Sequence, residues 1–361
     1  MEEMPPPSHM QISANLDLMR AVAVMSVFSS HLCQSLGVQG LGSLGRFGVF
    51  LFFIHTSFVL MASLQRLETT ARNNVSLAVA FWIRRIFRIY PLAILCVVLT
   101  AVFEIPAHPW ETYSWIGLKG FLSNLALMQN FTHSLDIQAP LWSLPVEVQM
   151  YVILPFAYLA MQGDKRYRSL VLWVLSVTIA LGALLLIAML PMPEQNKPWL
   201  VQRISAVIYA PCFLSGAVAF DLVRNSTWQW KLPAWMWPLG IFGAIALYGP
   251  HDDAIILSKL IRAWWISIAL GVLFANVREV RPNWTRPVFH WIAEHSYGIY
   301  LSHSIVFWIV FYRMAQFSPW VQIPALIAGS IGIPALLYVS IEKPLIATGG
   351  NLARRILEFG K

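Results

Sequence analysis

Residues 16–31 read LDLMRAVAVMSVFSSH, an apolar stretch that carries one arginine and one histidine well inside it. A helix of about 20 apolar residues crosses a bilayer core of roughly 30 Å. Arg20 and His31 are eleven positions apart, and eleven steps of about 100° return a helix to within roughly 20° of its starting direction, so both side chains lie on one face about 16 Å apart. Ionisable side chains inside a bilayer are costly and mark functional sites. The stretch therefore predicts a membrane-spanning helix that presents a guanidinium and an imidazole to a polar interior.

The composition of the whole chain excludes a water-soluble domain. Of the 361 residues 58% are hydrophobic and 12% are charged, whereas soluble domains carry about 25% charged residues. The net charge of +8 does not indicate a nucleic-acid partner, because the basic residues lie in short runs between apolar stretches, as in membrane proteins. Cys33, Cys96 and Cys212 lie inside apolar stretches without metal-like spacing, which favours buried packing residues over a disulfide framework or a zinc site.

The apolar segments predict an all-α, polytopic membrane protein with about ten transmembrane helices around a membrane-crossing cavity. The chain is expected to form one domain over residues 1–361, with residues 1–14 as a short cytoplasmic tail and 343–361 as a cytoplasmic C-terminal tail. The predicted spans are 16–38, 45–65, 80–103, 144–162, 169–190, 203–223, 234–249, 255–277, 288–312 and 319–342.

The distribution of basic residues predicts the orientation. With the N-terminus in the cytoplasm, most of the 25 Lys and Arg residues fall on inner connections, as the positive-inside rule requires. An even number of spans then places both termini in the cytoplasm. The stretch 104–143 would lie on the outer side, where its polar and proline residues favour a re-entrant or interfacial segment over another span.

Two arginines stand at the inner end of the third span. Arg85 and Arg88 share a helix face, and guanidinium groups there can bind phosphate oxygens in pairs. The alternative is a positive-inside anchor. The residues of the first span also have structural alternatives. Arg20 can extend to the inner interface beside Asp17, and His31 can be a neutral, hydrogen-bonded histidine.

Further candidates lie in two other segments. In Trp142-Ser143-Leu144-Pro145-Val146-Glu147 the proline suits the first turn of a helix, and Glu147 either complements the helix dipole or, at the outer mouth of a cavity, orients an imidazole or helps to deprotonate an alcohol. In the ninth span, Tyr297 and His303 are placed to line the same cavity, although structural hydrogen bonding is the alternative for both.

Taken together, these segments resemble the acyltransferase 3 family of membrane-bound acyltransferases, and the resemblance covers nearly the whole chain. It is carried by several runs in the same order, namely Leu16-Asp17 to Arg20-Ala21 with His31, Gly48 to Phe53, Arg85 to Arg88, Trp142-Ser143-Leu144 with Glu147, Ser296-Tyr297 to His303, and Glu342-Lys343-Pro344. One departure is Thr56-Ser57-Phe58, where the family usually has Ser-Gly-Phe.

The resemblance implies an enzyme of the bacterial cytoplasmic membrane that transfers an acyl group, often acetyl from acetyl-CoA, to a hydroxyl of a carbohydrate or glycolipid. Implied acceptors include lipopolysaccharide O-antigen, exopolysaccharide and peptidoglycan. In this chain Arg20, Arg85 and Arg88 would bind the CoA donor, and His31 would act as general base with Glu147 beside it. The remaining candidates, Trp142, Ser143, Tyr297 and His303, would contact the substrate, and no metal is required.

Two other classes of protein remain open from the residues alone. A secondary transporter or exporter also places Arg, His and Glu inside the membrane, but the chain shows no internal repeat of the kind that such proteins often carry. A catalytically silent scaffold is the third reading, which the altered Thr56-Ser57-Phe58 segment keeps open.

Overall fold

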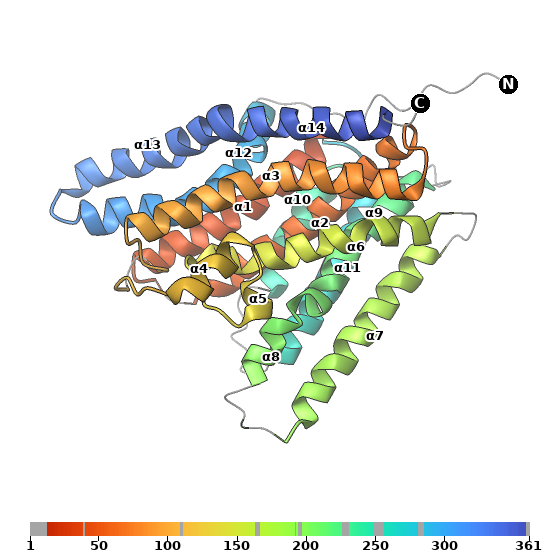
Figure 1. The fold of residues 1–361 in the computed structure, drawn as a ribbon, viewed down its shortest axis with the longest axis horizontal. Coiled ribbons are helices and arrows are strands. Elements are labelled where there is room, and N and C mark those ends of the chain that lie inside the picture. The colour runs from red at the N-terminus through yellow and green to blue at the C-terminus, as the bar shows by residue number, and fades with distance from the viewer. Residues whose placement is uncertain are drawn as a thin grey trace.

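A computed structural model describes residues 13–38, 40–108, 111–162, 167–191, 193, 197–225, 231–248, 256–280 and 285–358. Within these residues the chain is almost entirely helical, and the one strand-like contact is an isolated bridge between Leu232 and Val277 (Figure 1). The long helices are α1 (Ala14–Ser35), α2 (Gly42–Glu68), α3 (Asn74–Val102), α6 (Ser143–Met161), α7 (Arg168–Met189), α9 (Ser205–Arg224), α10 (Met236–Tyr248), α11 (Ile256–Asn276), α12 (Arg286–Phe307), α13 (Pro319–Leu337) and α14 (Lys343–Glu358). The shorter elements are α4 (Gly117–Leu125), α5 (Gln129–Thr132), η2 (Ala139–Trp142), α8 (Lys197–Arg203) and the π-helical turns η4 (Trp308–Arg313) and η5 (Tyr338–Glu342).

Each of the ten predicted spans falls on a helix, and the all-α polytopic prediction is confirmed. Eight helices of the described chain are long and apolar enough to cross a membrane. The other two predicted spans differ. α10 has only 13 residues, and α12 is long but does not reach the required hydropathy, since it carries polar residues that face the interior.

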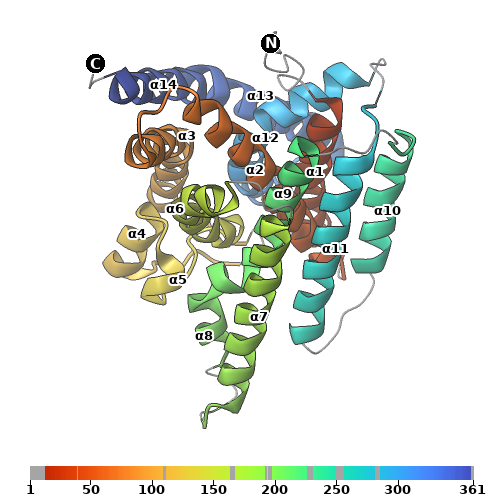
Figure 2. The ribbon, with the colours of Figure 1, turned by 90° about the vertical axis from the view of Figure 1, so that its right-hand side faces the viewer.

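The centre of the bundle is α2, which contacts α1, α3, α6, α9 and α11. Figure 2 shows it in the middle of the molecule, and α7 packs against α9 at one side of the bundle. Close approach of the backbones depends on small residues, as is usual between membrane helices. A Cβ atom added to Gly48 would lie 2.4 Å from the carbonyl oxygen of Ala23, and one added to Gly271 would lie 2.7 Å from that of Ser215.

The altered Thr56-Ser57-Phe58 segment lies at one of these close contacts. Ser57 is fully buried, and the glycine at the contact comes from the neighbouring helix, because a Cβ on Gly216 of α9 would stand 2.1 Å from the carbonyl oxygen of Ile54. The serine therefore fits opposite a glycine, and the helices still pack closely without a glycine at position 57.

The start of α1 is fixed to the connection between α11 and α12. Ser13 caps the helix by accepting a hydrogen bond from the backbone N–H of Leu16 and donates to Glu279, and Asn15 donates from its backbone to the same carboxylate at 2.8 Å. Since α1 and α2 are antiparallel, this end of the bundle also carries the turn between α2 and α3. We call it the basic end, because Arg66, Arg72, Arg278, Arg286 and Arg354 lie there.

At the other end, residues 103–108 and 111–142 form a cap. They consist of α4, α5 and η2 joined by turns, with Glu104, Leu127 and His133 in the left-handed region. Asn124 holds the cap together, since its amide donates to the carbonyls of Gly120 and Leu135 and accepts from the backbone of Ile137.

Within the predicted tail at 343–361, the described residues up to Glu358 are helical. α13, η5 and α14 form one continuous helix over residues 319–358, visible along the top of Figure 1. Pro344 does not end it, because the π-helical turn η5 just before the proline changes the hydrogen-bond register. α14 packs against α3, with Gly349 directly on Phe87.

Candidate functional site

Three cavities follow one another through the bundle between the cap and the basic end. The outer cavity, of about 550 Å³, lies under the cap and is lined by His31. The middle cavity, of about 50 Å³, shares Val49 and Tyr300 with the outer one. The inner cavity, of about 90 Å³, shares Arg20, Glu147 and two further residues with the middle one. The two groups that the first helix was expected to present to a polar interior thus line successive cavities, Arg20 the middle and inner ones and His31 the outer one.

His31 makes its closest polar contact with a second histidine. Its Nδ1 lies 2.7 Å from Nε2 of His303 on α12, and the two rings stack with centroids 5.0 Å apart. The contact arises because α1 and α12 are neighbours that both start at the basic end. His303 lines none of the three cavities. From the sequence we expected His303 to contact the substrate. In the structure it contacts His31, the candidate base.

The inner cavity gathers three guanidinium groups, but they are not equivalent. Arg88 forms an ion pair of 2.6 Å with Glu342 and lies over the ring of Tyr297. Arg85 lies over the ring of Phe81, and its Nε is buried without a hydrogen-bond partner. Arg20 has no hydrogen-bond or ion-pair partner among the residues that the structure describes.

Arg20 and Arg85 therefore keep positive charge that no direct carboxylate contact in this part of the chain offsets. Such groups attract an anion or the polarised oxygen of a carbonyl group.

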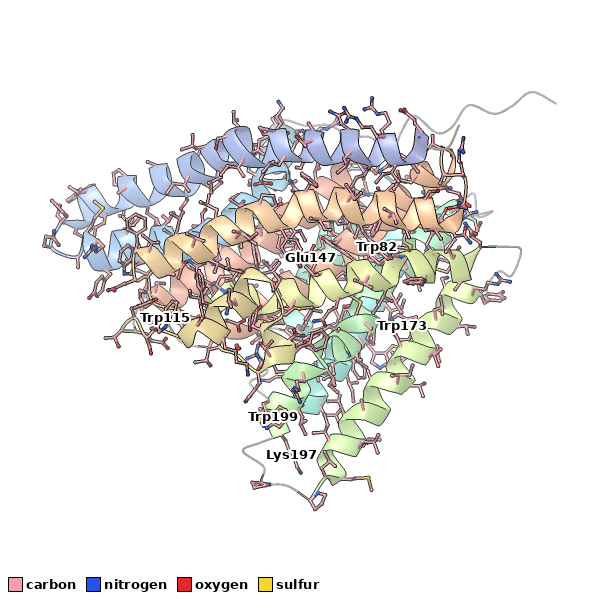
Figure 3. All side chains as sticks on the ribbon, viewed as in Figure 1. Trp82, Trp115, Glu147, Trp173, Lys197 and Trp199 are labelled. Atoms are coloured by element: carbon pink, nitrogen blue, oxygen red, sulfur yellow. The ribbon has the colours of Figure 1, made fainter. Side chains whose placement is uncertain are left out.

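Glu147 lies deeper than the outer mouth predicted from the sequence. It lines the middle and inner cavities, and Figure 3 shows it near the middle of the bundle, away from Trp115 at the cap. Tyr151, one helical turn later, donates a hydrogen bond to its carboxylate. Glu147 also lies near enough to Arg20 and Arg85 to interact with their charges. Its position suits ordering these guanidinium groups more than touching a molecule in the outer cavity.

The other predicted contacts are distributed over the series of cavities. Trp142 lines the outer cavity and Ser143 the middle one. Ser143 donates at 2.8 Å to the hydroxyl of Tyr300, whose own proton goes to the carbonyl of Pro140. Tyr297 lines the middle and inner cavities and donates at 2.7 Å to the carbonyl of Ile89. These bonds fix the aromatic side chains that separate one cavity from the next.

The outer cavity contains polar groups that sequence reasoning missed. Arg46, His108 and Asp136 line it together with His31. Oδ1 of Asp136 is buried without a hydrogen-bond partner, and burial raises the pKa of this carboxyl to about 6. The only signal in the sequence was the polar character of residues 104–143. A cavity of this size with a few polar groups is typical of a small-molecule site.

Glu342 was also missed as a site residue, although its Glu-Lys-Pro context was noticed. Its side chain is 1% exposed, and one oxygen holds Arg88 while Oε1 has no partner. Among the described residues no group of three His, Cys, Asp or Glu side chains is arranged to hold a metal ion.

Comparison with known proteins gives one family match over most of the chain. Residues 13–339 match the family model described as an acyltransferase domain. The peptidoglycan O-acetyltransferase OatA of Listeria monocytogenes is 26% identical over 93% of this chain, which spans only 56% of that protein's length. Nodulation protein 10 of Rhizobium leguminosarum bv. viciae is 24% identical over 95% of this chain and 96% of its own length. No solved structure matches.

Proposed function

Because the chain belongs to the acyltransferase 3 family, we propose that it transfers an acyl group, in the first instance acetyl, from acyl-CoA to a hydroxyl group of a carbohydrate or glycolipid. The observation that carries the proposal is the series of three cavities, with guanidinium groups in the inner one and an imidazole in the outer one. A relative named for peptidoglycan O-acetylation supports the acetyl group and the glycan acceptor.

The donor enters from the basic end, which we take as the cytoplasmic end, with both termini in the cytoplasm of a bacterial inner membrane. The inner and middle cavities are too small for a nucleotide, so only the acyl thioester and its narrow arm enter them. Arg20 and Arg85 then attract the thioester carbonyl or the nearest phosphate. Arg88, already paired with Glu342, keeps this part of the wall in place.

The nucleotide phosphates remain at the surface of the basic end. Arg84 interacts there with the charges of Arg66 from α2 and Arg354 from α14, and Nε of Arg84 is buried without a hydrogen-bond partner. Three like charges from three helices repel one another, so an anion between them is favourable. The phosphate groups of CoA supply such an anion.

The acceptor occupies the outer cavity, and the reaction takes place where Val49 and Tyr300 separate the outer from the middle cavity. His31 removes the proton of the acceptor hydroxyl while the oxygen attacks the thioester carbonyl carbon. The C–S bond breaks, an oxygen ester forms, and the thiolate of CoA receives the proton from His31. A thioester is an activated electrophile, so a general base worth about 10²- to 10⁴-fold together with positioning is sufficient.

Transfer can be tested with the purified protein in liposomes, supplied with labelled acetyl-CoA and fragments of bacterial cell-envelope glycan. We expect alkali-labile label on the glycan, detected by mass spectrometry. His31→Ala should lower transfer by about 10²- to 10⁴-fold, and His290→Ala is the matched control, because His290 is an exposed histidine that contacts Asp17 at the basic end. Equal activity of His31→Ala and wild type would remove His31 from the chemistry.

The same preparation tests the competing class of protein. A secondary transporter would move a solute into the liposomes without forming an ester bond. Uptake of glycan or label with no covalent product would therefore replace the enzyme proposal with the transporter.

A further inference from the structure

The pair formed by His31 and His303 determines which nitrogen of His31 can act as a base. We propose that His303 is a positioning residue that sets the tautomer and ring orientation of His31, so that Nε2 of His31 is the atom that accepts the proton. The inference rests on the proposed acyl transfer, and it gives His303 a role through His31 and none in contacting the substrate.

The chain of hydrogen bonds starts at a backbone carbonyl. Nδ1 of His303 lies 3.1 Å from the carbonyl oxygen of Ile299, one turn earlier in α12. A carbonyl oxygen only accepts hydrogen bonds, so Nδ1 of His303 carries a proton. The remaining nitrogen of His303, Nε2, is the one that meets Nδ1 of His31 at 2.7 Å.

The surroundings of His303 decide the direction of this second bond. The residue is 1% exposed, and its ring lies against Phe28, Tyr300 and Phe307. No carboxylate contacts it among the residues that the structure describes. A buried imidazolium without a counter-ion is costly, so His303 is neutral and its Nε2 carries a lone pair.

Because Nε2 of His303 accepts, Nδ1 of His31 is the donor and carries a proton. A neutral imidazole has one N–H, so the lone pair of His31 is on Nε2, the nitrogen that His303 does not use. His31 lines the outer cavity and His303 does not. The base atom is therefore the one left for the acceptor hydroxyl.

The same bond also serves the charged form of His31. After Nε2 takes the proton from the hydroxyl, the positive charge is shared with Nδ1–H, which still donates to the lone pair of His303. The carbonyl of Ile299 at the far side of His303 polarises this lone pair further. A neutral orienting group of this kind adds no net charge to the membrane interior, where an additional carboxylate would be costly.

Three substitutions at His303 separate this role from simple packing. In His303→Gln the amide oxygen reaches the place of Nε2, because both atoms are four bonds from Cα, and it accepts the proton of His31. In His303→Asn the oxygen corresponds to Nδ1 and does not reach. His303→Leu fills the space without an acceptor.

We expect His303→Gln to keep most of the activity, and His303→Asn and His303→Leu to lower kcat about 10- to 100-fold, the usual effect of removing an orienting group, with little change in the KM of the acceptor. The thermal unfolding of each variant is the control for folding. An unchanged kcat in His303→Leu would overturn the proposal, as would equal losses in all three variants. A raised acceptor KM with unchanged kcat would instead return His303 to a substrate contact.

A second measurement is independent of turnover. In protein labelled with ¹⁵N-histidine, solid-state NMR distinguishes protonated from unprotonated ring nitrogens, and His31→Ala assigns the signals. We expect Nδ1–H and an unprotonated Nε2 for His31 in the wild type and in His303→Gln, and a mixture of tautomers in His303→Leu. Finding Nε2–H on His31 in the wild type would refute the inference whether or not transfer is observed, and the expected tautomer without any transfer would refute the proposed function alone.

Discussion

The ion pair between Arg88 and Glu342 allows one prediction to be worked out from the geometry. The two charges are 2.6 Å apart, and the side chains are 18% and 1% exposed. At an effective dielectric constant of about 20, the attraction is about 6 kcal/mol before the cost of desolvation is subtracted. Removing one partner leaves the other charge buried, which costs about 3–5 kcal/mol. We therefore expect Glu342→Leu or Arg88→Met alone to destabilise the protein by about this amount.

The double variant Arg88→Met, Glu342→Leu should recover most of the lost stability, because an apolar pair of similar volume replaces a buried ion pair at little net cost. The four proteins form a double-mutant cycle, measured as the free energy of unfolding in mixed micelles. A double variant no more stable than the worse single variant would refute the reasoning. A Glu342→Leu protein as stable as wild type would do the same.

The double variant also separates the two readings of Arg88 that the sequence left open. If it transfers acetyl groups with a normal dependence on acyl-CoA, Arg88 acts only in holding α3 to the C-terminal helix. A stable double variant with a raised KM for acyl-CoA would indicate that the guanidinium also contacts the donor.

Three further predictions follow from other parts of the fold. Gly216→Ala should strongly lower the thermal unfolding midpoint, because its Cβ would stand 2.1 Å from the carbonyl oxygen of Ile54. Gly243→Ala on α10 is the control and should be neutral or stabilising, because a Cβ there has nothing within 4 Å. Equal unfolding midpoints of the two variants would contradict the close contact at Gly216. Asp136 has a folded pKa of about 6, above the usual value for a free aspartate, so the folded protein binds a proton at this carboxyl more tightly than the unfolded chain does. The folded protein therefore loses stability relative to Asp136→Asn as the pH rises from the usual aspartate pKa to about 6. Unfolding midpoints measured from pH 4 to 7 that run parallel for the two proteins would exclude the shift. Asn124→Ala loses three hydrogen bonds in the cap, each worth about 1 kcal/mol. In the transfer assay it should raise the KM for the acceptor but not the KM for acyl-CoA. A raised KM for acyl-CoA alone would place the acceptor elsewhere.

The helical architecture was largely predictable because most of the long helices carry their own signal in apolar length. The predicted span 80–103 matches α3 at its end, but the helix starts earlier, at Asn74, where Asn73 and Ser76 form a capping box that apolarity does not reveal. The last predicted span ends at residue 342, whereas the helix continues through Pro344 to Glu358. A proline usually ends a helix, and its tolerance here depends on a π-helical turn that no residue pattern announces.

The candidate site was predictable only within single helices. The spacing of Arg20 and His31 reports one face of α1, and both side chains do line the cavities. That Glu342 meets Arg88, and that His303 meets His31, depends on which helices are neighbours. A single sequence shows which face of each helix is apolar but does not show which helices are neighbours. An α-helix can bury its apolar face equally well against several partners. The depth of Glu147 was misjudged for the same reason.

The partition formed by Val49 and Tyr300 has a consequence for the living cell. A donor on one side and an acceptor on the other would invite an open pore, through which protons and sodium ions would run down their gradients. Under the proposed function, the hydrogen bonds of the Tyr300 hydroxyl to Ser143 and Pro140 hold this side chain between the two cavities, where it would block that leak. Transfer of an acetyl group between the two cavities would then leave the ion gradients across the membrane intact.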